Sequence, residues 1–326
     1  MAHSRDRLSV PLQPGIATEI FRRCLTEPFA KAFGVTVDTP ARSEHFLEDV
    51  QEDIKTGRHS YDVVEWPQHL FRKAKRAGMC MKLDYARMPN LADMHPRYLD
   101  PSAFGVGVFV YGMVPVYVPG MVPRPITSWA DLWAPELKGK IALRDQIAPG
   151  QLMAITCKVL GIGTERLRDE KTFERAWTKL TALVAQAGLW ASSEGHVQEI
   201  IASRHAAVSQ QFIDVAQIQK DRGVEIEVVF PSEGPVWAYR SWTIVEGSRN
   251  AELAREFINF VQGPGPQKDL AESFFGHPTN RKVKLDERLL PRIYGGRLTD
   301  ADLSFPDWDW YLDRSNVEER WKRLIA

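Results

Sequence analysis

The stretch VVFPSEGPVWAYRSWTIV, residues 228–245, is the most informative part of this chain. It predicts a strand, a tight turn containing proline and glycine, and a second strand rich in large polar aromatics with Arg240 in its middle. Rigid amphipathic rings around a guanidinium are typical of a small-molecule cleft. A second interpretation stays open, in which Trp237 and Tyr239 alternate with a merely solvated Arg240 along an amphipathic strand.

A second run of the same character, FGVGVFVYGMVPVY, occupies residues 104–117. The two aromatic, β-rich runs bracket a middle block of the chain. With them the chain resembles the solute-binding proteins of bacterial ABC importers, specifically the spermidine/putrescine-like group with the type II periplasmic binding fold. The resemblance implies that the two runs are hinge strands between two lobes.

The composition is that of an ordinary soluble protein, with 326 residues, 44% hydrophobic and 26% charged. Lys+Arg and Asp+Glu both number 42, so the charge gives no reason to expect a nucleic-acid partner or an anionic membrane surface. No apolar run approaches the roughly 20 residues that cross a bilayer. The first residues also show no apolar secretion signal, so we expect either a cytoplasmic protein or a signal that this sequence lacks.

Catalytic and metal-binding motifs are missing from the sequence. Cys24, Cys80 and Cys157 form neither a CxxC pair nor a metal pattern with histidine, which favours small buried hydrophobes. Glycine-rich phosphate loops, nucleophile elbows and His-Glu-x-x-His motifs are also missing. The sequence therefore predicts a binding protein without a cofactor or metal, and not an enzyme.

The first part of the chain alternates strand and helix patterns. Short apolar runs predict strands, and apolar residues at helical spacing between them predict helices, in the order 8–12, 16–29, 35–37, 46–54 and 61–66. This order implies parallel strands joined by right-handed crossovers. Ligands bind beyond the carboxyl ends of such strands, which selects loops that hold Gln13, Arg42 and Trp66.

The run ITSWADLW with PELKGKIAL, residues 126–133 and 135–143, resembles the most specific signature of the family. Physically it predicts a capped helix and a Lys-Gly turn into the first strand of the second lobe. Later strand ends direct Asp145, Ser193 and Gln211 toward the expected cleft. The helical patterns after residue 250 and the aromatic tail also resemble the family, so the likeness covers nearly the whole chain.

The resemblance implies an α/β fold with two lobes, each a mostly parallel sheet flanked by helices. Residues 1–110 with 243–326 are expected to form a discontinuous lobe 1, and residues 115–235 to form lobe 2. The hinge strands are expected at about 106–116 and 236–245. Lobe 2 would therefore be an insertion between two parts of lobe 1.

The expected ligand differs from that of polyamine-binding relatives, which hold ammonium groups with acidic side chains. Alignment with the family places Arg240 where an ammonium-binding aspartate stands, and Arg42 near a second acidic position. Two guanidinium groups attract a carboxylate, phosphonate or sulfonate. The alternative is that Arg240 pairs with Glu65 or Asp145 and is structural. The complete predicted ligand site is Gln13, Arg42, Trp66, Tyr111, Asp145, Ser193, Gln211, Trp237, Tyr239, Arg240 and Trp242.

The function implied by the resemblance is the solute-binding component of an ABC importer, which captures a small organic molecule by hinge closure. Its partners would be the ABC permease and ATPase of the inner membrane, its location the periplasm, and its state a monomer. Two alternatives stay open: a polyamine-binding protein of the same transporter class, and a ligand-sensing protein without a transporter. The sequence leaves the ligand's identity and charge undecided.

Overall fold

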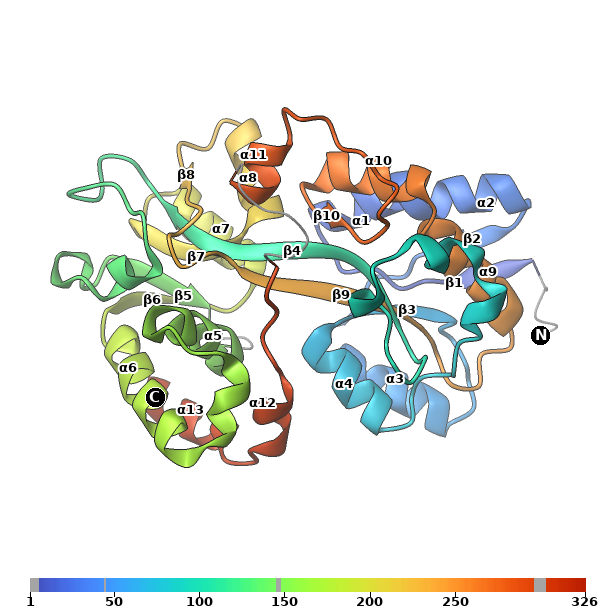
Figure 1. The fold of residues 1–326 in the computed structure, drawn as a ribbon, viewed down its shortest axis with the longest axis horizontal. Coiled ribbons are helices and arrows are strands. Elements are labelled where there is room, and N and C mark those ends of the chain that lie inside the picture. Colours follow the sequence, from blue (N-terminus) through green and yellow to red (C-terminus); the bar gives the residue numbers. More distant parts are fainter. Residues whose placement is uncertain (1–5, 44, 145–147, 296–302) are drawn as a thin grey trace. The chain divides into compact units, whose positions relative to one another are not determined.

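The computed structural model describes residues 6–43, 45–144, 148–295 and 303–326. The chain divides into two compact units (Figure 1), unit 1 from Met1–Val110 and Tyr239–Leu289, and unit 2 from Tyr111–Ala238 and Leu290–Ala326. Helices and strands alternate through both units, which confirms the predicted α/β class.

Unit 1 combines short strands with helices that bury aromatic faces. Its helices are α1 (Ile16–Phe21), α2 (Glu27–Phe33), α3 (Phe46–Lys55), α4 (Gln68–Arg76), α9 (Ala251–Val261) and α10 (Pro264–Phe274). Its strands are β1 (Arg7–Ser9), β2 (Thr36–Asp38), β3 (Val63–Pro67) and β10 (His277–Pro278), with parts of β4 (Val106–Tyr117) and β9 (Val236–Ile244).

Unit 2 holds the remaining elements. Its helices are α5 (Ala148–Leu160), α6 (Glu170–Val184), α7 (Glu194–Ala202), α8 (Ile213–Asp221), α11 (Leu290–Tyr294), α12 (Asp309–Asp313) and α13 (Val317–Ile325). Its strands are β5 (Ile141–Arg144), β6 (Ala187–Ala191), β7 (Val208–Phe212) and β8 (Glu227–Val228), with the other parts of β4 and β9.

The alternation predicted for the beginning of the chain is present in unit 1. Strand β1 is parallel to β2, with Leu8 opposite Val37. Helix α2 ends at Gly34, whose φ of 67° is the left-handed conformation that glycine adopts without steric cost. Strand β3 is antiparallel to β9, with Trp66 opposite Ser241. In the strand order, β9 lies between β3 and β4.

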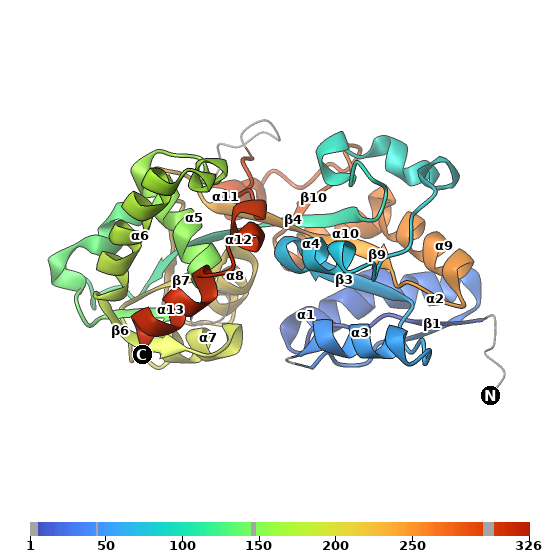
Figure 2. The ribbon, with the colours of Figure 1, turned by 90° about the horizontal axis from the view of Figure 1, so that it is seen from below.

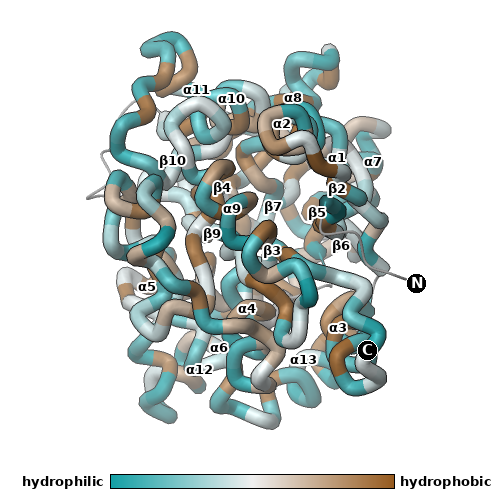
Figure 3. The backbone as a smooth tube through the Cα atoms, turned by 90° about the vertical axis from the view of Figure 1, so that its right-hand side faces the viewer, coloured by the Kyte–Doolittle hydropathy of each residue, from teal (hydrophilic) through white to brown (hydrophobic). Residues whose placement is uncertain are grey.

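The sheet of unit 2 mixes both strand directions. Strand β5 is parallel to β6 and to β7, whereas β4 is antiparallel to β7. The core of this unit includes Trp129, Leu143 and Phe173, all fully buried. In Figure 3 hydrophobic residues are concentrated in inner segments and hydrophilic residues in outer loops and helix faces, as burial of apolar surface requires.

The family-like signature forms a capped turn in unit 2. The Ser128 hydroxyl accepts a hydrogen bond from Ala130 N at 2.9 Å, and Asp131 Oδ2 accepts one from Ser128 N at 3.0 Å. This reciprocal capping satisfies N–H groups that the first turn leaves without partners. Glu233 adds to it, because its carboxylate accepts from Trp129 N at 3.1 Å.

The C-terminal tail differs from the predicted domain assignment. Residues 290–326 were expected in lobe 1, but they belong to unit 2, and Figure 2 shows α12 and α13 lying against the helices of that unit. Trp310, Tyr311 and Trp321 are buried in the core that also contains Phe173 and Trp177. The aromatic pattern of the tail predicts a buried face, but a single sequence carries no signal for which core receives it.

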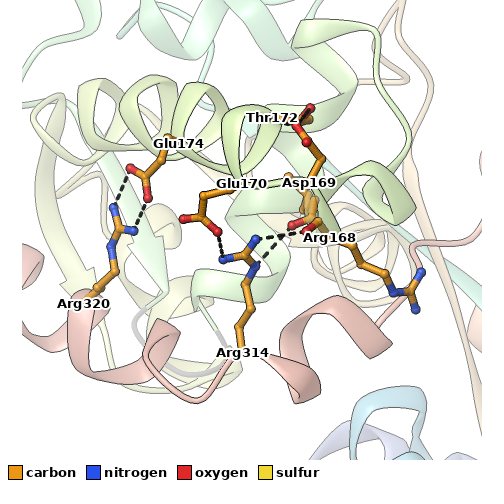
Figure 4. Close-up of polar contacts among 8 residues, drawn as sticks. Arg168, Asp169, Glu170, Thr172, Glu174, Arg314 and Arg320 are labelled. Atoms are coloured by element: carbon orange, nitrogen blue, oxygen red, sulfur yellow. Dashed lines mark hydrogen bonds and ion pairs between the residues drawn. The ribbon is translucent and has the colours of Figure 1, made fainter.

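Two arginines of the tail fasten it to α6, and we call Arg314 and Arg320 the arginine clamp (Figure 4). Arg314 Nη1 lies 2.8 Å from Glu170 Oε2, and Arg320 Nη2 lies 3.0 Å from Glu174 Oε2. The Arg314 guanidinium carbon is 4.1 Å from the centre of the Phe173 ring, so this group is stacked as well as paired. An ion pair whose guanidinium also stacks on an aromatic ring contributes more to stability than an exposed ion pair alone.

We expect Arg320→Ala to lower the free energy of unfolding of unit 2 by about 1–2 kcal/mol, because it removes both an ion pair and a stacked cation. Its guanidinium carbon lies 4.4 Å from the centre of the Trp177 ring. Arg323→Ala is the matched control on the same helix, since that side chain is 75% exposed and pairs only with Glu319 among the described residues. The control should change stability by less than about 0.5 kcal/mol in urea unfolding. Equal effects of the two substitutions would contradict a role for the clamp.

Candidate functional site

Three charged side chains meet in unit 1, and we call Arg42, Glu65 and Arg240 the charged triad. Arg42 follows β2, Glu65 lies within β3, and Arg240 lies within β9. Arg42 Nη1 is 3.3 Å from Glu65 Oε2, and Arg240 Nε is 2.8 Å from Glu65 Oε1. The antiparallel register sets this geometry, because Glu65 is opposite Trp242, two positions from Arg240 on the same face of the sheet.

The members of the triad differ in exposure. The side chains of Arg42 and Glu65 are 4% and 3% exposed, whereas that of Arg240 is 20% exposed. Arg42 Nε and Nη2 donate hydrogen bonds to Pro11 O at 3.0 and 2.9 Å. Burial lowers the pKa of Arg42 to about 10, and the nearby charge of Arg240 adds to this effect while Glu65 opposes it. Arg42 and Glu65 are therefore fixed inside unit 1, and Arg240 is the member that solvent reaches.

Two guanidinium groups and one carboxylate give the triad a formal charge of 2 − 1 = +1. The contact between Arg240 Nε and Glu65 Oε1 is an ion pair without the geometry of a regular hydrogen bond. His69 also lies within this field, and burial, with the charges of Lys73 and Arg240, lowers its pKa to about 3. The imidazole is therefore neutral near pH 7 and adds no charge to the site. The formal charge of the triad remains +1, which attracts negative groups.

Tyr239 precedes Arg240 and points to the other face of β9, since successive side chains of a strand alternate. Its ring meets that of Tyr98 edge-on, with centroids 5.6 Å apart. Gly107 makes this approach possible, because a Cβ there would lie 2.9 Å from Tyr98 Cβ and 3.4 Å from the Tyr239 ring. Burial raises the pKa of the Tyr239 hydroxyl, while a hydrogen bond with Gln68 opposes the rise.

The three predicted tryptophans are core side chains. Trp66 and Trp237 are 2% exposed and Trp242 is 0% exposed. Trp66 Nε1 donates to Thr243 Oγ1 at 3.0 Å, and the Trp242 ring packs edge-on to Phe257 at 5.5 Å. None of the three presents a ring face to solvent in the described structure, so their predicted contact with a ligand has no support from their exposure.

Other predicted residues lie in several places. Gln211 is 1% exposed and bonded on both sides, donating to Ser209 Oγ at 3.1 Å and accepting from Gln219 Nε2 at 2.7 Å. Ser193 is exposed and caps α7, where its Oγ accepts from His196 N at 3.1 Å. These contacts give Gln211 and Ser193 structural partners within unit 2.

The remaining predicted residues are Tyr111, Gln13 and Asp145. Tyr111 is half-buried, with its ring edge-on to Phe212 at 5.0 Å. Gln13 is exposed in the loop after β1. Asp145 lies outside the described residues. The structure therefore brings together Arg42 and Arg240 through Glu65.

Two charged residues are more central in the structure than in the sequence prediction. The sequence places Glu65 at the start of a loop expected near the ligand and offers it as a partner of Arg240. A carboxylate within the apolar strand VVEWP is also a signal for a buried ion pair. Arg144, at the end of β5, was not predicted. It pairs with Glu194, and its guanidinium carbon lies 5.4 Å from the centre of the Phe212 ring.

Comparison with known proteins agrees with this architecture. The chain is 29% identical over 328 residues to the spermidine/putrescine-binding periplasmic protein of Escherichia coli (strain K12), covering 95% of this chain and 90% of that protein. It is 27% identical over 296 residues to a gamma-aminobutyric acid-binding protein of Pseudomonas aeruginosa, covering 86% and 80%. Both relatives are named as binding proteins.

A solved structure shares the fold. It is an ABC transporter substrate-binding protein from Bradyrhizobium japonicum USDA 110, with a TM-score of 0.86 at 19% identity, covering 98% of this chain and 99% of that one. Across the part of the chain that the structure describes, every helix is too short or too polar to span a membrane. The family model for the bacterial extracellular solute-binding protein matches residues 25–289. The predicted resemblance is thus confirmed, and the chain belongs to the bacterial extracellular solute-binding proteins.

Proposed function

We propose that this solute-binding protein captures a small organic solute whose anionic group pairs with Arg240. It delivers that solute to an ABC permease and ATPase, and it works in the periplasm, as one relative's name indicates for that relative. Binding involves closure of the two units and no covalent turnover.

The observation that carries this proposal is the charged triad. Its formal charge is +1, and Arg240 is its most exposed member, at 20% against 4% for Arg42 and 3% for Glu65. An anionic group on the solute brings the local charge to zero and forms a charge-assisted hydrogen bond with the guanidinium. A dication placed there would instead meet a positive field.

The names of the relatives indicate two kinds of ligand, which differ in charge. One is named for spermidine and putrescine, which are cations, and another for gamma-aminobutyric acid, which carries a carboxylate as well as an amine. Polyamine binding is the second candidate for this chain, and similarity to the first relative is what favours it. The only carboxylate of the triad, Glu65, is already shared between two arginines, so the triad offers no acidic group for an ammonium.

A ligand panel on one carbon skeleton separates the two candidates. We expect succinate or gamma-aminobutyrate to raise the melting temperature of the full chain, and putrescine to leave it unchanged. A ligand at 100 times its dissociation constant adds about 2.7 kcal/mol of stability, which a thermal-shift assay detects. Butyrate and butylamine each carry one of the two charged groups, and butanol controls for the apolar chain alone. Stabilisation by putrescine and spermidine but by none of the acids would overturn the proposal in favour of polyamine binding.

A further inference from the structure

A cavity of about 340 Å³ lies inside unit 2. Helix α5 contributes one wall, the turn before β9 a second, and the segment from Ser304 to Pro306 a third. Its volume is at the lower end of the roughly 300–1,000 Å³ in which proteins hold small molecules. The third wall is fixed, because Asp307 N donates a hydrogen bond to Thr164 Oγ1 at 2.7 Å and Arg168 Nη1 lies 2.6 Å from Asp307 Oδ2. The walls are therefore held in place by contacts within the chain.

The lining carries one ammonium and two carboxylates, those of Lys158, Glu165 and Glu233, so its formal charge is −1. Two of these groups offset each other at the turn before β9. Lys158 Nζ lies 3.5 Å from the position that a Cβ would take on Gly234, and burial lowers the pKa of Lys158 while the charge of Glu233 raises it. Glu233 is also hydrogen-bonded, since its Oε1 accepts from Ser128 Oγ at 2.6 Å. The charge that is left over is that of Glu165.

Glu165 is an exposed residue whose carboxylate forms neither an ion pair nor a hydrogen bond within the described ranges. The carboxylate lies against the position that a Cβ would take on Gly163, and both residues line the cavity. It is also close to the buried thiol of Cys157, because burial raises the pKa of Cys157 to about 12 and the charge of Glu165 adds to the rise. The carboxylate is thus directed at the cavity, where it can accept charge-assisted hydrogen bonds from a cation.

We propose that this cavity is a second ligand site, which takes a small organic monoammonium ion with its charged group on Glu165 and its apolar chain against Val236 and Phe305. One positive charge on the ligand brings the formal charge of the lining to zero. A second ammonium would meet the positive charge of Lys158, which is half-buried, so a diamine is disfavoured. One ionic contact combined with apolar side chains fixes the orientation of a small amphipathic molecule. The site lies in unit 2 and does not rest on the proposed function, which concerns the charged triad of unit 1.

The test uses pentylamine, a cation near pH 7, as probe and Cys157 as reporter, because this thiol lines the cavity. The full chain is treated with the small thiol reagent methyl methanethiosulfonate, and the modification of each cysteine is followed by peptide mass spectrometry. We expect saturating pentylamine to slow the modification of Cys157 at least fivefold. Cys24 and Cys80, which are buried in unit 1, are internal controls and should not change. Pentanol, which has the same chain without the charge, should not protect Cys157.

The pentylamine concentration that half-protects Cys157 gives a dissociation constant for this site alone. Glu165→Gln should raise that constant at least fivefold. Glu199→Gln is the matched control and should leave it unchanged, because it removes an exposed carboxylate of unit 2 that is outside the cavity lining. Each variant is compared with its own modification rate without amine, since loss of a charge changes the reactivity of the thiol. Cadaverine, the diamine of the same chain length, should protect Cys157 at least fivefold less well than pentylamine.

The inference is overturned if pentylamine fails to protect Cys157, if it protects all three cysteines alike, or if pentanol protects as well. Equal constants for Glu165→Gln and Glu199→Gln would also overturn it, as would equal protection by cadaverine. None of these outcomes bears on the proposed function, because every measurement reports on Cys157 in unit 2 and none depends on Arg240.

Discussion

Glu65→Gln is expected to lower the free energy of unfolding by about 3–5 kcal/mol, the largest stability effect that we anticipate from a single substitution in unit 1. Glu65 is 3% exposed and is the carboxylate that both arginines of the triad share. Its removal leaves two guanidinium groups close together with a formal charge of +2. Repulsion and the cost of desolvating the unpaired charges then add, whereas the glutamine keeps the shape of the side chain.

Urea unfolding followed by circular dichroism measures this loss. Glu252→Gln is the matched control, because Glu252 also touches two arginines but its side chain is 71% exposed. Exposed ion pairs contribute about 0–1 kcal/mol, so the free energy of unfolding of the control should be close to that of the unchanged protein. A second comparison adds Arg240→Gln to Glu65→Gln. It should recover part of the stability, because it removes one of the two repelling charges. If Glu65→Gln costs no more than Glu252→Gln, the triad is not the buried network described above.

Local structure was largely predictable from the sequence because it depends on short-range patterns. The run from Leu8 to Trp66 carries the alternation that becomes β1, α1, α2, β2, α3 and β3. Gly34 marks the end of α2 because only glycine accepts its φ of 67° without strain. Cys24, Cys80 and Cys157 are buried, as predicted for small hydrophobic side chains.

The candidate site was less predictable, because it depends on which face of a strand is buried and against what. Trp242 has an amphipathic ring that suits either a cleft or a core, and only the packing of Phe257 against it decides for the core. The pairing of Arg240 with Glu65 depends on the register of β3 against β9. That register joins residues about 175 positions apart, and no local pattern encodes it. The placement of the tail in unit 2 likewise depends on contacts between residues that are far apart in the sequence.

Arg240→Gln is expected to weaken binding of the cognate organic acid about tenfold to a hundredfold. A hydrogen bond to a charged group contributes roughly 1.5–3 kcal/mol, and each 1.4 kcal/mol changes affinity tenfold. The fold should persist, because Arg42 and Glu65 remain as a buried, formally neutral pair, 3.3 Å apart. Relief of repulsion between the two arginines also offsets part of the lost contact, since the charge of Arg240 lowers the pKa of Arg42.

Isothermal titration of the best acid from the ligand panel measures this change on folded protein, with the melting temperature recorded for each variant. Arg58→Gln is the matched control in unit 1, because Arg58 also pairs with a buried carboxylate, that of Asp53, but its side chain is 61% exposed. The control should bind the acid as the unchanged protein does. Arg240→Lys keeps the charge but loses the planar fork of donors. If the carboxylate is held by a bidentate contact, the affinity of this variant for the acid should lie between those of the unchanged protein and of Arg240→Gln. Tight binding of putrescine or spermidine that is insensitive to all three substitutions would show that the positive charge of the triad serves the fold of unit 1 alone, and that the ligand is recognised elsewhere.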